Sequence, residues 1–271
     1  MQIYRGLDVG SAKPTIAERA RVPHHLIDVL APDGDFSAAE FATAGRQALA
    51  DVALRRRLPI VVGGSGLYFR ALMRGLFEGP RRDEALRQRL DTMASRFGDA
   101  RLHRWLGHVD APSAARISPA DRLRVVRALE VLKTTGLPLS EHLRRPHQPL
   151  TGFTALVVGL NPPRAALRRR VERRADQMLA SGLVEEVRGL LAEGYSAALR
   201  PLRAIGYRQA VAMLEGRLTP AEARTALVAD TMRYAKRQMT WFRREPVQWF
   251  ESAGEARAAI DAFLGERPPS H

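Results

Sequence analysis

The sequence predicts an α/β protein that carries a helical insertion. Short apolar runs alternate with longer segments of helical periodicity in both end regions of the 271-residue chain. The strand pattern disappears between residues 81 and 150, where only helical segments remain, and it returns at residues 154–160. We therefore expect an α/β core formed by residues 1–80 and 151–271, with residues 81–150 inserted as a helical subdomain.

The first part of the core is expected to contain two strands and two helices. Residues 24–29 have the composition of a strand, and residues 59–62 that of a buried parallel strand. Ser37, followed by Glu40 three residues later, forms a capping box that predicts a helix to about residue 56. The second helix should begin near Leu67, directly after a glycine-rich turn.

That turn has the sequence Gly63-Gly64-Ser65-Gly66 and lies where the predicted strand enters the helix. Backbone N–H groups at such a turn can face an anion or a polar substrate. Glycines also serve tight turns that bind nothing, and both interpretations stay open at this point.

The remaining elements are predicted by helical periodicity and by capping residues. The insertion should hold helices at residues 83–97, 99–108 and 121–135. After the strand at 154–160, an arginine-rich helix should follow Pro162-Pro163 and run to about residue 179. Thr219 with Glu222 and Ser252 with Glu255 are capping pairs that predict a long basic helix and a final helix. Residues 267–271 are expected to form a loose tail.

The composition points to a polyanionic partner. The chain has a formal net charge of +14 and an isoelectric point near 11.2, which favours salt-sensitive association with nucleic acid. It has no cysteine, so disulfides, thiolate catalysis and cysteine metal sites are excluded. No apolar run is long enough to span a bilayer and no signal pattern begins the chain, so we expect a cytoplasmic protein without a membrane role.

The local clustering of charge is most pronounced at residues 231–244. This segment combines five cationic side chains and three aromatic ones with no carboxylate. At helical spacing Met232, Ala235, Met239 and Phe242 form an apolar seam, Arg233, Arg237 and Arg244 share a second face, and Tyr234, Gln238 and Trp241 form a third. The pattern is typical of a surface that holds single-stranded RNA with guanidinium groups and flat rings. The alternative is a solvated cationic helix.

Weaker candidates lie elsewhere. Lys13 follows Gly10-Ser11-Ala12 but does not complete a phosphate loop, so we consider it only as an anion contact from a loop. Arg170 and Arg174, four residues apart on a helix, could clamp a diphosphate, or they could belong to a solvated helix paired with Glu172 and Asp176. His24, His25 and Asp28 are not expected to bind a metal, because no further ligand cluster accompanies them.

Eight motifs in order resemble those of the tRNA dimethylallyltransferases, also called tRNA isopentenyltransferases. The resemblance extends over nearly the whole chain and is specific because the motifs occur in sequence. They lie at residues 1–14, 22–29, 36–41, 63–68, 121–131, 173–187, 203–209 and 234–244.

The resemblance implies an activity and a fold. It implies transfer of a dimethylallyl group from dimethylallyl diphosphate to N6 of the adenosine adjacent to the tRNA anticodon. It also implies a P-loop NTPase-like parallel sheet core with a helical insertion that embraces the anticodon stem, and a monomeric enzyme that uses Mg²⁺. The adenine would have to leave its stack to reach the donor.

The resemblance also implies roles for individual residues. Arg174 matches the arginine near the diphosphate, and Arg170, Lys13, Gly63 and Gly64 are tentative members of the substrate channel. The positions that match tRNA contacts of the family are Ser65, Arg87, Leu123, Arg124, Val125, Val126, Arg127, Arg203, Ala204, Ile205, Gly206, Tyr207, Arg208, Lys236, Arg237, Gln238, Met239, Thr240, Trp241, Phe242 and Arg243. Leu123 stands where the family often has glutamine, which weakens one base contact.

One departure from the family pattern affects catalysis. Family members have a phosphate loop and an Asp-Ser pair before the residues that match Met1-Gln2-Ile3-Tyr4, and these features are not found in the 271 residues. The aspartate is the family's general base, so we expect this chain by itself to be inactive, to lack metal ligands and to expose strand edges and apolar surface. Two explanations are open, a start assigned downstream of the true one and a gene that is truncated, and we prefer the first.

Two other functions remain as alternatives at this point. A non-catalytic tRNA-binding remnant would keep the basic helices and transfer nothing. A small-molecule P-loop kinase relative would bind a nucleoside without affinity for tRNA, and the composition of residues 231–244 argues against it.

Overall fold

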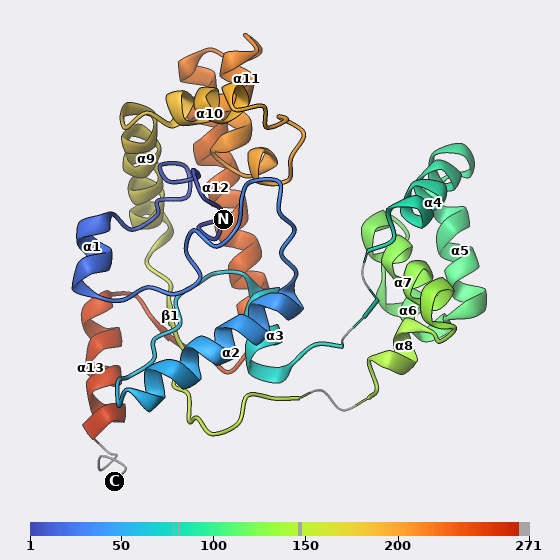
Figure 1. Cartoon of the computed structure of the whole chain (residues 1–271), viewed down its shortest axis with the longest axis horizontal. Coiled ribbons are helices and arrows are strands. Elements are labelled where there is room, and N and C mark those ends of the chain that lie inside the picture. Colours follow the sequence, from blue (N-terminus) through green and yellow to red (C-terminus); the bar gives the residue numbers. More distant parts are fainter. Residues whose placement is uncertain (78, 81, 146–147, 266–271) are drawn as a thin grey trace. The chain divides into compact units, whose positions relative to one another are not determined.

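The computed structural model describes residues 1–77, 79–80, 82–145 and 148–265. The chain divides into two compact units, one formed by Met1–Phe69 with Thr151–His271 and the other by Arg70–Leu150 (Figure 1). We call them unit 1 and unit 2. The division falls at Arg70, which is earlier in the chain than the boundary expected at residue 81.

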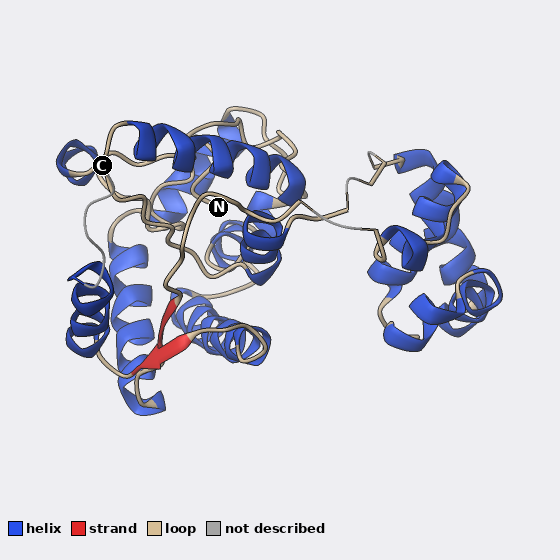
Figure 2. Cartoon of the chain, turned by 90° about the horizontal axis from the view of Figure 1, so that it is seen from below, coloured by secondary structure: helices blue, strands red, loops and turns tan. Residues whose placement is uncertain are grey.

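Unit 1 combines helices with a small parallel sheet. Strands β1 (Val158–Leu160) and β2 (Gln248–Phe250) pair in parallel, with Gly159 opposite Trp249 (Figure 2). The helical elements are α1 (Ile16–Arg21), α2 (Ala38–Leu54), α3 (Gly66–Arg74, which continues into unit 2), α9 (Arg164–Ala180), α10 (Leu183–Ala192), η1 (Pro201–Arg203), α11 (Tyr207–Leu214), α12 (Pro220–Phe242) and α13 (Ala253–Gly265). The described part of the chain is thus mostly helical, and the small parallel sheet is consistent with an α/β fold.

The capping pairs begin the helices that they predict. Ser37 and Glu40 form a reciprocal capping box at the start of α2. Thr219 and Glu222 do the same at α12, where Pro220 occupies the first helical position. The Ser252 hydroxyl accepts a hydrogen bond from the Glu255 N–H at the start of α13. These helix predictions are confirmed, as is the arginine-rich helix α9.

The strand prediction for residues 24–29 is wrong. This segment contains Leu26 and Asp28 with φ angles of 60° and 56°, and such left-handed residues interrupt an extended chain. The only ladder contact near it in the described chain is an isolated parallel bridge between Tyr4 and Leu30.

The prediction of a buried strand at residues 59–62 is also wrong. Ile60, Val61 and Val62 are 75%, 55% and 90% exposed and lie outside any ladder. A strand needs a neighbour that accepts its backbone hydrogen bonds, and the described residues provide none beside this segment. Of the strand expected at 154–160, only Val158–Leu160 is formed. The predicted P-loop-type sheet is therefore represented in the described residues only by β1 and β2.

Two clusters of buried apolar residues stabilise unit 1. The larger one packs α10 and α11 against the N-terminal segment, with Leu7, Leu183, Val187 and Tyr207 fully enclosed. The smaller one lies between α9 and α12, and its buried residues are Val171, Ala175, Leu227 and Val228. This packing fixes the long helix α12 against the arginine-rich helix α9.

Unit 2 is helical throughout its described residues. It contains α4 (Glu84–Phe97), α5 (Asp99–Val109), α6 (Ala111–Arg116), α7 (Arg122–Thr135) and α8 (Leu139–His142). Helix α7 contributes Val125, Val126, Ala128 and Leu129 to a core that it shares with α4 and α5. The three helices predicted for this region are confirmed to within about two residues.

Two further findings complete the description. None of the described helices is long and apolar enough to cross a membrane. The tail expected at residues 267–271 lies outside the described residues.

Candidate nucleic-acid interface

The glycine-rich turn packs directly on the C-terminal half of α12. The Gln238 side chain donates a hydrogen bond from Nε2 to the Gly64 carbonyl oxygen at 2.9 Å. A Cβ atom at Gly64 would lie 1.9 Å from that nitrogen, and one at Gly66 would lie 2.1 Å from the Trp241 ring. The turn needs glycine at these two positions because α12 side chains occupy the space of a Cβ atom.

Trp241 therefore faces the inside of unit 1. Its ring meets Phe69 edge-on at a centroid distance of 6.4 Å and Phe242 at 4.9 Å, while Phe69 and Phe242 are 5.5 Å apart. Trp241 and Gln238 are half-buried, because the glycines let α12 approach the turn on that side, and their contacts with RNA stay a prediction. Only Tyr234 of that face is exposed, at 40%.

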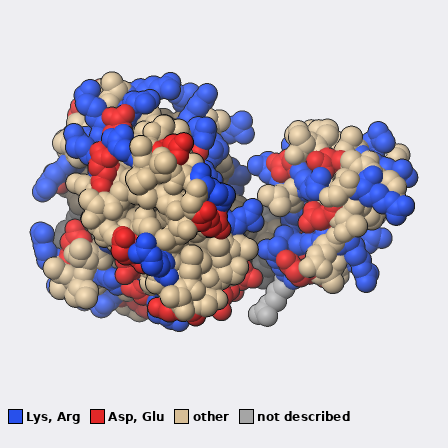
Figure 3. Space-filling model, turned by 90° about the horizontal axis from the view of Figure 1, so that it is seen from above, with Lys and Arg blue, Asp and Glu red and all other residues tan. Residues whose placement is uncertain are grey.

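The cations of α12 remain on the surface. Arg233, Lys236, Arg237 and Arg243 are exposed, and so is Arg244, which follows the helix. The Arg237 guanidinium lies 5.6 Å from the centroid of the Tyr234 ring, which favours a cation–π contact. Met239 and Phe242 are half-buried and Thr240 is exposed. On the faces that Figure 3 shows, Lys and Arg side chains are widespread, with carboxylates between them.

A buried carboxylate connects α12 with the segment that contains Arg203 to Arg208. Asp230 pairs with Arg208 and with Arg233, and it accepts a hydrogen bond from Gln209 Nε2 at 2.6 Å. Burial alone would raise the pKa of the Asp230 carboxyl, but the hydrogen bonds from the two guanidinium groups outweigh it and hold the pKa below its usual range. Asp230 thus fixes one arginine from each of two candidate stretches.

The same network extends to the start of α11. Gln209 Oε1 accepts a hydrogen bond from the Gly206 N–H at 2.9 Å, and Gly206 has a φ of 94°, which favours glycine. Tyr207 is fully buried and donates its hydroxyl to Glu186 at 2.8 Å. Burial and the nearby Glu186 carboxylate raise the pKa of Tyr207. The tRNA contact predicted for Tyr207 is not supported by this geometry, because the whole side chain is enclosed.

Replacing Asp230 with asparagine should destabilise unit 1 by about 1–3 kcal/mol, because two charge-assisted hydrogen bonds lose their anionic acceptor. Urea unfolding followed by circular dichroism would measure this. The matched control is Asp176→Asn, which removes an Asp–Arg pair with Arg224 between α9 and α12 whose side chains are 52% and 42% exposed. We expect a smaller change there, and equal changes in the two variants would contradict the prediction.

Lys13 does not reach outward. Its side chain is 1% exposed, and Nζ bonds the Tyr4 carbonyl oxygen at 2.9 Å and Asp28 Oδ1 at 2.5 Å, with Asp8 as a further partner. The adjacent backbone N–H groups of Asp8 and Val9 donate to Glu186 Oε2 at 3.0 and 2.7 Å. The anion contact predicted for Lys13 is wrong in this structure, because its buried ammonium group already pairs with the carboxylates of Asp8 and Asp28.

The described residues contain no group of three or more His, Asp or Glu side chains that could hold a metal ion. Mg²⁺ is commonly held by one or two carboxylates together with substrate phosphates and water, so the expected use of Mg²⁺ stays a prediction. Asp28 is committed to Lys13 and to Arg19 Nη1 at 2.7 Å.

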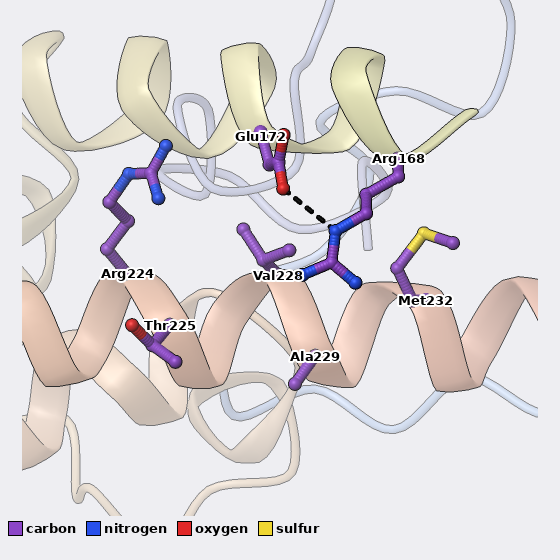
Figure 4. Close-up of a pocket in the computed structure, with 7 residues that line it drawn as sticks. All are labelled: Arg168, Glu172, Arg224, Thr225, Val228, Ala229 and Met232. Atoms are coloured by element: carbon purple, nitrogen blue, oxygen red, sulfur yellow. Dashed lines mark hydrogen bonds and ion pairs between the residues drawn. The ribbon is translucent and has the colours of Figure 1, made fainter. Parts of the chain in front are cut away.

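A small pocket of about 190 Å³ lies between α9 and α12 (Figure 4). Arg168 pairs with Glu172, one turn further along α9, at 2.9 Å, and Arg224 of α12 pairs with Asp176 of α9. Its lining consists of Arg168, Glu172, Arg224, Thr225, Val228, Ala229 and Met232. Both arginines already have carboxylate partners, so the pocket has little free positive charge.

Arg170 and Arg174, the predicted diphosphate clamp, lie outside this pocket. Both are exposed on α9, and neither has an ion pair with a described carboxylate. The acids that were considered as their alternative partners, Glu172 and Asp176, pair with Arg168 and Arg224 instead. The two guanidinium groups are therefore available to an anion, and their role at a diphosphate stays a prediction.

In unit 2 the candidate residues of α7 have different environments. Val125 and Val126 are 1% and 3% exposed in the core, so the tRNA contacts predicted for their side chains are not supported. Leu123 is 78% exposed, and Arg124 pairs with Asp121 on the surface at 3.1 Å. Only one face of a helix can meet a partner, which explains why Leu123 and Arg124 lie at the surface while Val125 and Val126 are buried.

Arg87 and Arg127 both bind the buried carboxylate of Glu130. Arg87 makes two hydrogen bonds of 2.8 Å, and Arg127 makes one of 2.6 Å. Glu130 also accepts the Asp83 N–H at 2.8 Å and is fully buried. The side chains of the two arginines, which were predicted as tRNA contacts, are thus bound to this carboxylate. Only their remaining N–H groups could reach a phosphate.

The remaining candidates lie at the surface or near it. Gly63, Ser65 and Arg203 are exposed, whereas Ala204 and Ile205 are half-buried. In unit 1 the structure thus brings the glycine turn together with α12 and links residues 203–208 to α12 through Asp230. The buried carboxylates Asp230, Glu186 and Glu130 were not predicted from the sequence. Asp230 and Glu130 each lie three residues from a candidate arginine, which is a usable signal, whereas Glu186 stands beside Glu185 and carries no such signal.

The chain matches the family model described as IPP transferase over residues 2–245. It is 48% identical to the tRNA dimethylallyltransferase of Koribacter versatilis over 95% of this chain and 84% of that protein. It is 45% identical to the tRNA dimethylallyltransferase of Geobacter metallireducens, over 98% of this chain and 86% of that protein.

Solved structures show the same relationship. The full-length tRNA isopentenylpyrophosphate transferase from Bacillus halodurans superposes with a TM-score of 0.67 at 36% identity, over 98% of this chain and 84% of that one. A eukaryotic dimethylallyltransferase acting on tRNA has a TM-score of 0.80 at 22% identity and supports the fold alone. On the family match and these identities, the chain belongs to the IPP transferase family.

Proposed function

We propose that the protein is a tRNA dimethylallyltransferase, which transfers a dimethylallyl group from dimethylallyl diphosphate to N6 of the adenosine adjacent to the anticodon. The observation that carries the proposal is the family match over residues 2–245, together with 45–48% identity to enzymes of that name. The exposed cations of α12 beside the glycine turn support it locally, because they offer phosphate-binding groups next to a backbone turn. We expect a cytoplasmic monomer.

In this reaction the N6 lone pair attacks the allylic C1 of the donor. The C1–O bond breaks, its electron pair leaves with diphosphate, and N6 gives up a proton to a base. Arg170 and Arg174 are proposed to stabilise the negative charge on the leaving diphosphate. The exposed cations of α12 are proposed to hold the RNA while the adenine is unstacked.

The general base and the phosphate loop are not assigned to any of the 271 residues. A general base contributes about 10²- to 10⁴-fold in rate and an anion donor about 10²- to 10³-fold. Family membership leads us to expect Mg²⁺, and the steps proposed above do not depend on it.

The test uses the 271-residue chain with unmodified tRNA and labelled dimethylallyl diphosphate. We expect salt-dependent tRNA binding without incorporation of label, and incorporation by a longer version that includes the family's phosphate loop. Incorporation by the 271-residue chain would overturn the expected inactivity. Inactivity of the longer version would favour a non-catalytic tRNA-binding protein, and nucleoside binding without tRNA affinity would favour a kinase relative.

Arg237→Gln should weaken tRNA binding and lower the slope of log K against log salt by about 1, because one phosphate contact is lost. Filter binding at several salt concentrations measures both quantities. Arg217→Gln is the matched control, since Arg217 is an exposed arginine that pairs with Glu215. Equal slopes in the two variants would exclude a specific contact at Arg237.

A further inference from the structure

The junction of α4 and α5 in unit 2 gathers two arginines on one phenyl ring. Arg96 lies in the last turn of α4 and Arg101 in the first turn of α5, with Gly98 between the two helices at a φ of 85°. Their guanidinium carbons lie 5.1 and 4.9 Å from the centroid of the Phe97 ring. We call these three residues the α4–α5 corner. Cation–π attraction to Phe97 holds both charges in place at the surface.

Neither guanidinium of the corner is neutralised. Within the described residues, Arg96 and Arg101 form no ion pair, and the nearest acid in sequence, Asp99, is bound by Arg122 at 2.6 Å. The same holds for Arg89 and Arg104, which are exposed on α4 and α5. By contrast, five arginines of the unit have carboxylate partners, namely Arg82, Arg87, Arg122, Arg124 and Arg127.

The corner also exposes apolar surface. Phe97 is 46% exposed, and Met93, four residues earlier on the same face of α4, is 43% exposed. Arg89 lies one further turn along that face. An exposed apolar pair surrounded by unpaired arginines is complementary to a polyanion that also has non-polar surface, as the sugar–phosphate backbone of RNA has.

We propose that the α4–α5 corner binds the sugar–phosphate backbone of the RNA substrate. The inference rests on the proposed function, since it takes tRNA as that substrate. Arg96 and Arg101 contact phosphate oxygens through their planar N–H groups. Phe97 orients the two guanidinium groups and does not stack on a base, because they already lie over its ring. The corner therefore contributes affinity without sequence preference.

Binding of unmodified tRNA to the full 271-residue chain over a series of salt concentrations tests this inference. The double variant Arg96→Gln/Arg101→Gln should raise Kd about 10-fold and lower the salt slope by about 1.5 to 2, corresponding to two lost phosphate contacts. Phe97→Leu should raise Kd about 2- to 5-fold and leave the slope unchanged, because it removes the cation–π contacts and keeps both charges.

The matched control is Arg116→Gln/Arg144→Gln, which removes two exposed charges of unit 2, one at the end of α6 and one in the turn after α8. It should change Kd by less than about 2-fold. If the two double variants weaken tRNA binding equally, the inference about the corner is overturned, and the proposed function stands because the wild type still binds tRNA. If the wild type does not bind tRNA, both the inference and the proposed function are overturned. Corner-dependent binding to phosphatidylserine vesicles with unchanged tRNA affinity would assign the corner to anionic lipid and also overturn it.

Discussion

Replacing Glu130 with glutamine is expected to destabilise unit 2 by about 3 kcal/mol. The carboxylate is fully buried and accepts hydrogen bonds from Asp83, Arg87 and Arg127. Glutamine keeps one acceptor oxygen but turns an NH₂ group toward guanidinium donors, which leaves positive charge uncompensated. Breaking a buried ion pair costs about 3–5 kcal/mol. We expect the lower end of this energy range because the side chains of Arg87 and Arg127 are 20% and 33% exposed.

Urea unfolding followed by fluorescence would measure this loss in a Trp241→Phe/Trp249→Phe background, in which Trp105 of unit 2 is the remaining tryptophan. The control is Glu84→Gln, which removes an ion pair with Arg82 in which both side chains are more than half exposed. A surface pair of this kind contributes about 0–1 kcal/mol. A Glu130→Gln variant as stable as Glu84→Gln would show that the buried carboxylate does not hold α4 and α7 together.

The same carboxylate should make the stability of unit 2 dependent on acidic pH. Burial alone would raise the pKa of Glu130, but hydrogen bonds from Arg87 and Arg127 outweigh it and lower the pKa from 4.5 to about 2. A lowered pKa stabilises the fold fully above about pH 4.5, and this contribution is lost as the pH falls toward about 2. The free energy of unfolding should therefore fall more steeply between pH 5 and 3 in the wild type than in Glu130→Gln.

The helices could be predicted because their signals are local. Ser37 with Glu40 and Thr219 with Glu222 satisfy the first N–H groups of α2 and α12 from within four residues of sequence. The strands could not be predicted in the same way. Residues 59–62 have the composition of a strand, but such a segment forms a strand only beside a second strand that accepts its hydrogen bonds. Local pattern therefore determined where helices begin, and tertiary pairing determined which apolar runs became strands.

The candidate interface was likewise predictable only where its features depend on local sequence. Charge clustering correctly predicted exposed cations on α12, and the family prediction is confirmed by the match over residues 2–245. The orientation of Trp241, the burial of Tyr207 and the pairing of Lys13 all depend on residues far away in the sequence. A single sequence indicates which side chains a segment carries, but not which of them the fold encloses.

Gly66→Ala should destabilise unit 1 by about 1–3 kcal/mol and weaken tRNA binding, because a Cβ atom there would lie 2.1 Å from the Trp241 ring. The ring cannot simply move away, since Phe69 and Phe242 pack against it. Alanine would gain less than about 1 kcal/mol in helix propensity at the first residue of α3, which does not offset the clash.

The neighbouring glycines supply matched controls for this substitution. A Cβ atom at Gly63 meets nothing within 4 Å, so Gly63→Ala should change the free energy of unfolding by less than about 0.5 kcal/mol. Gly64→Ala should be intermediate, because it displaces only the flexible end of Gln238 and its 2.9 Å hydrogen bond. If the clash with Trp241 is the cause, Gly66→Ala should cost less in a Trp241→Leu background than alone. Equal costs in both backgrounds, measured by urea unfolding, would show that the close approach of α12 to the turn does not determine the need for glycine.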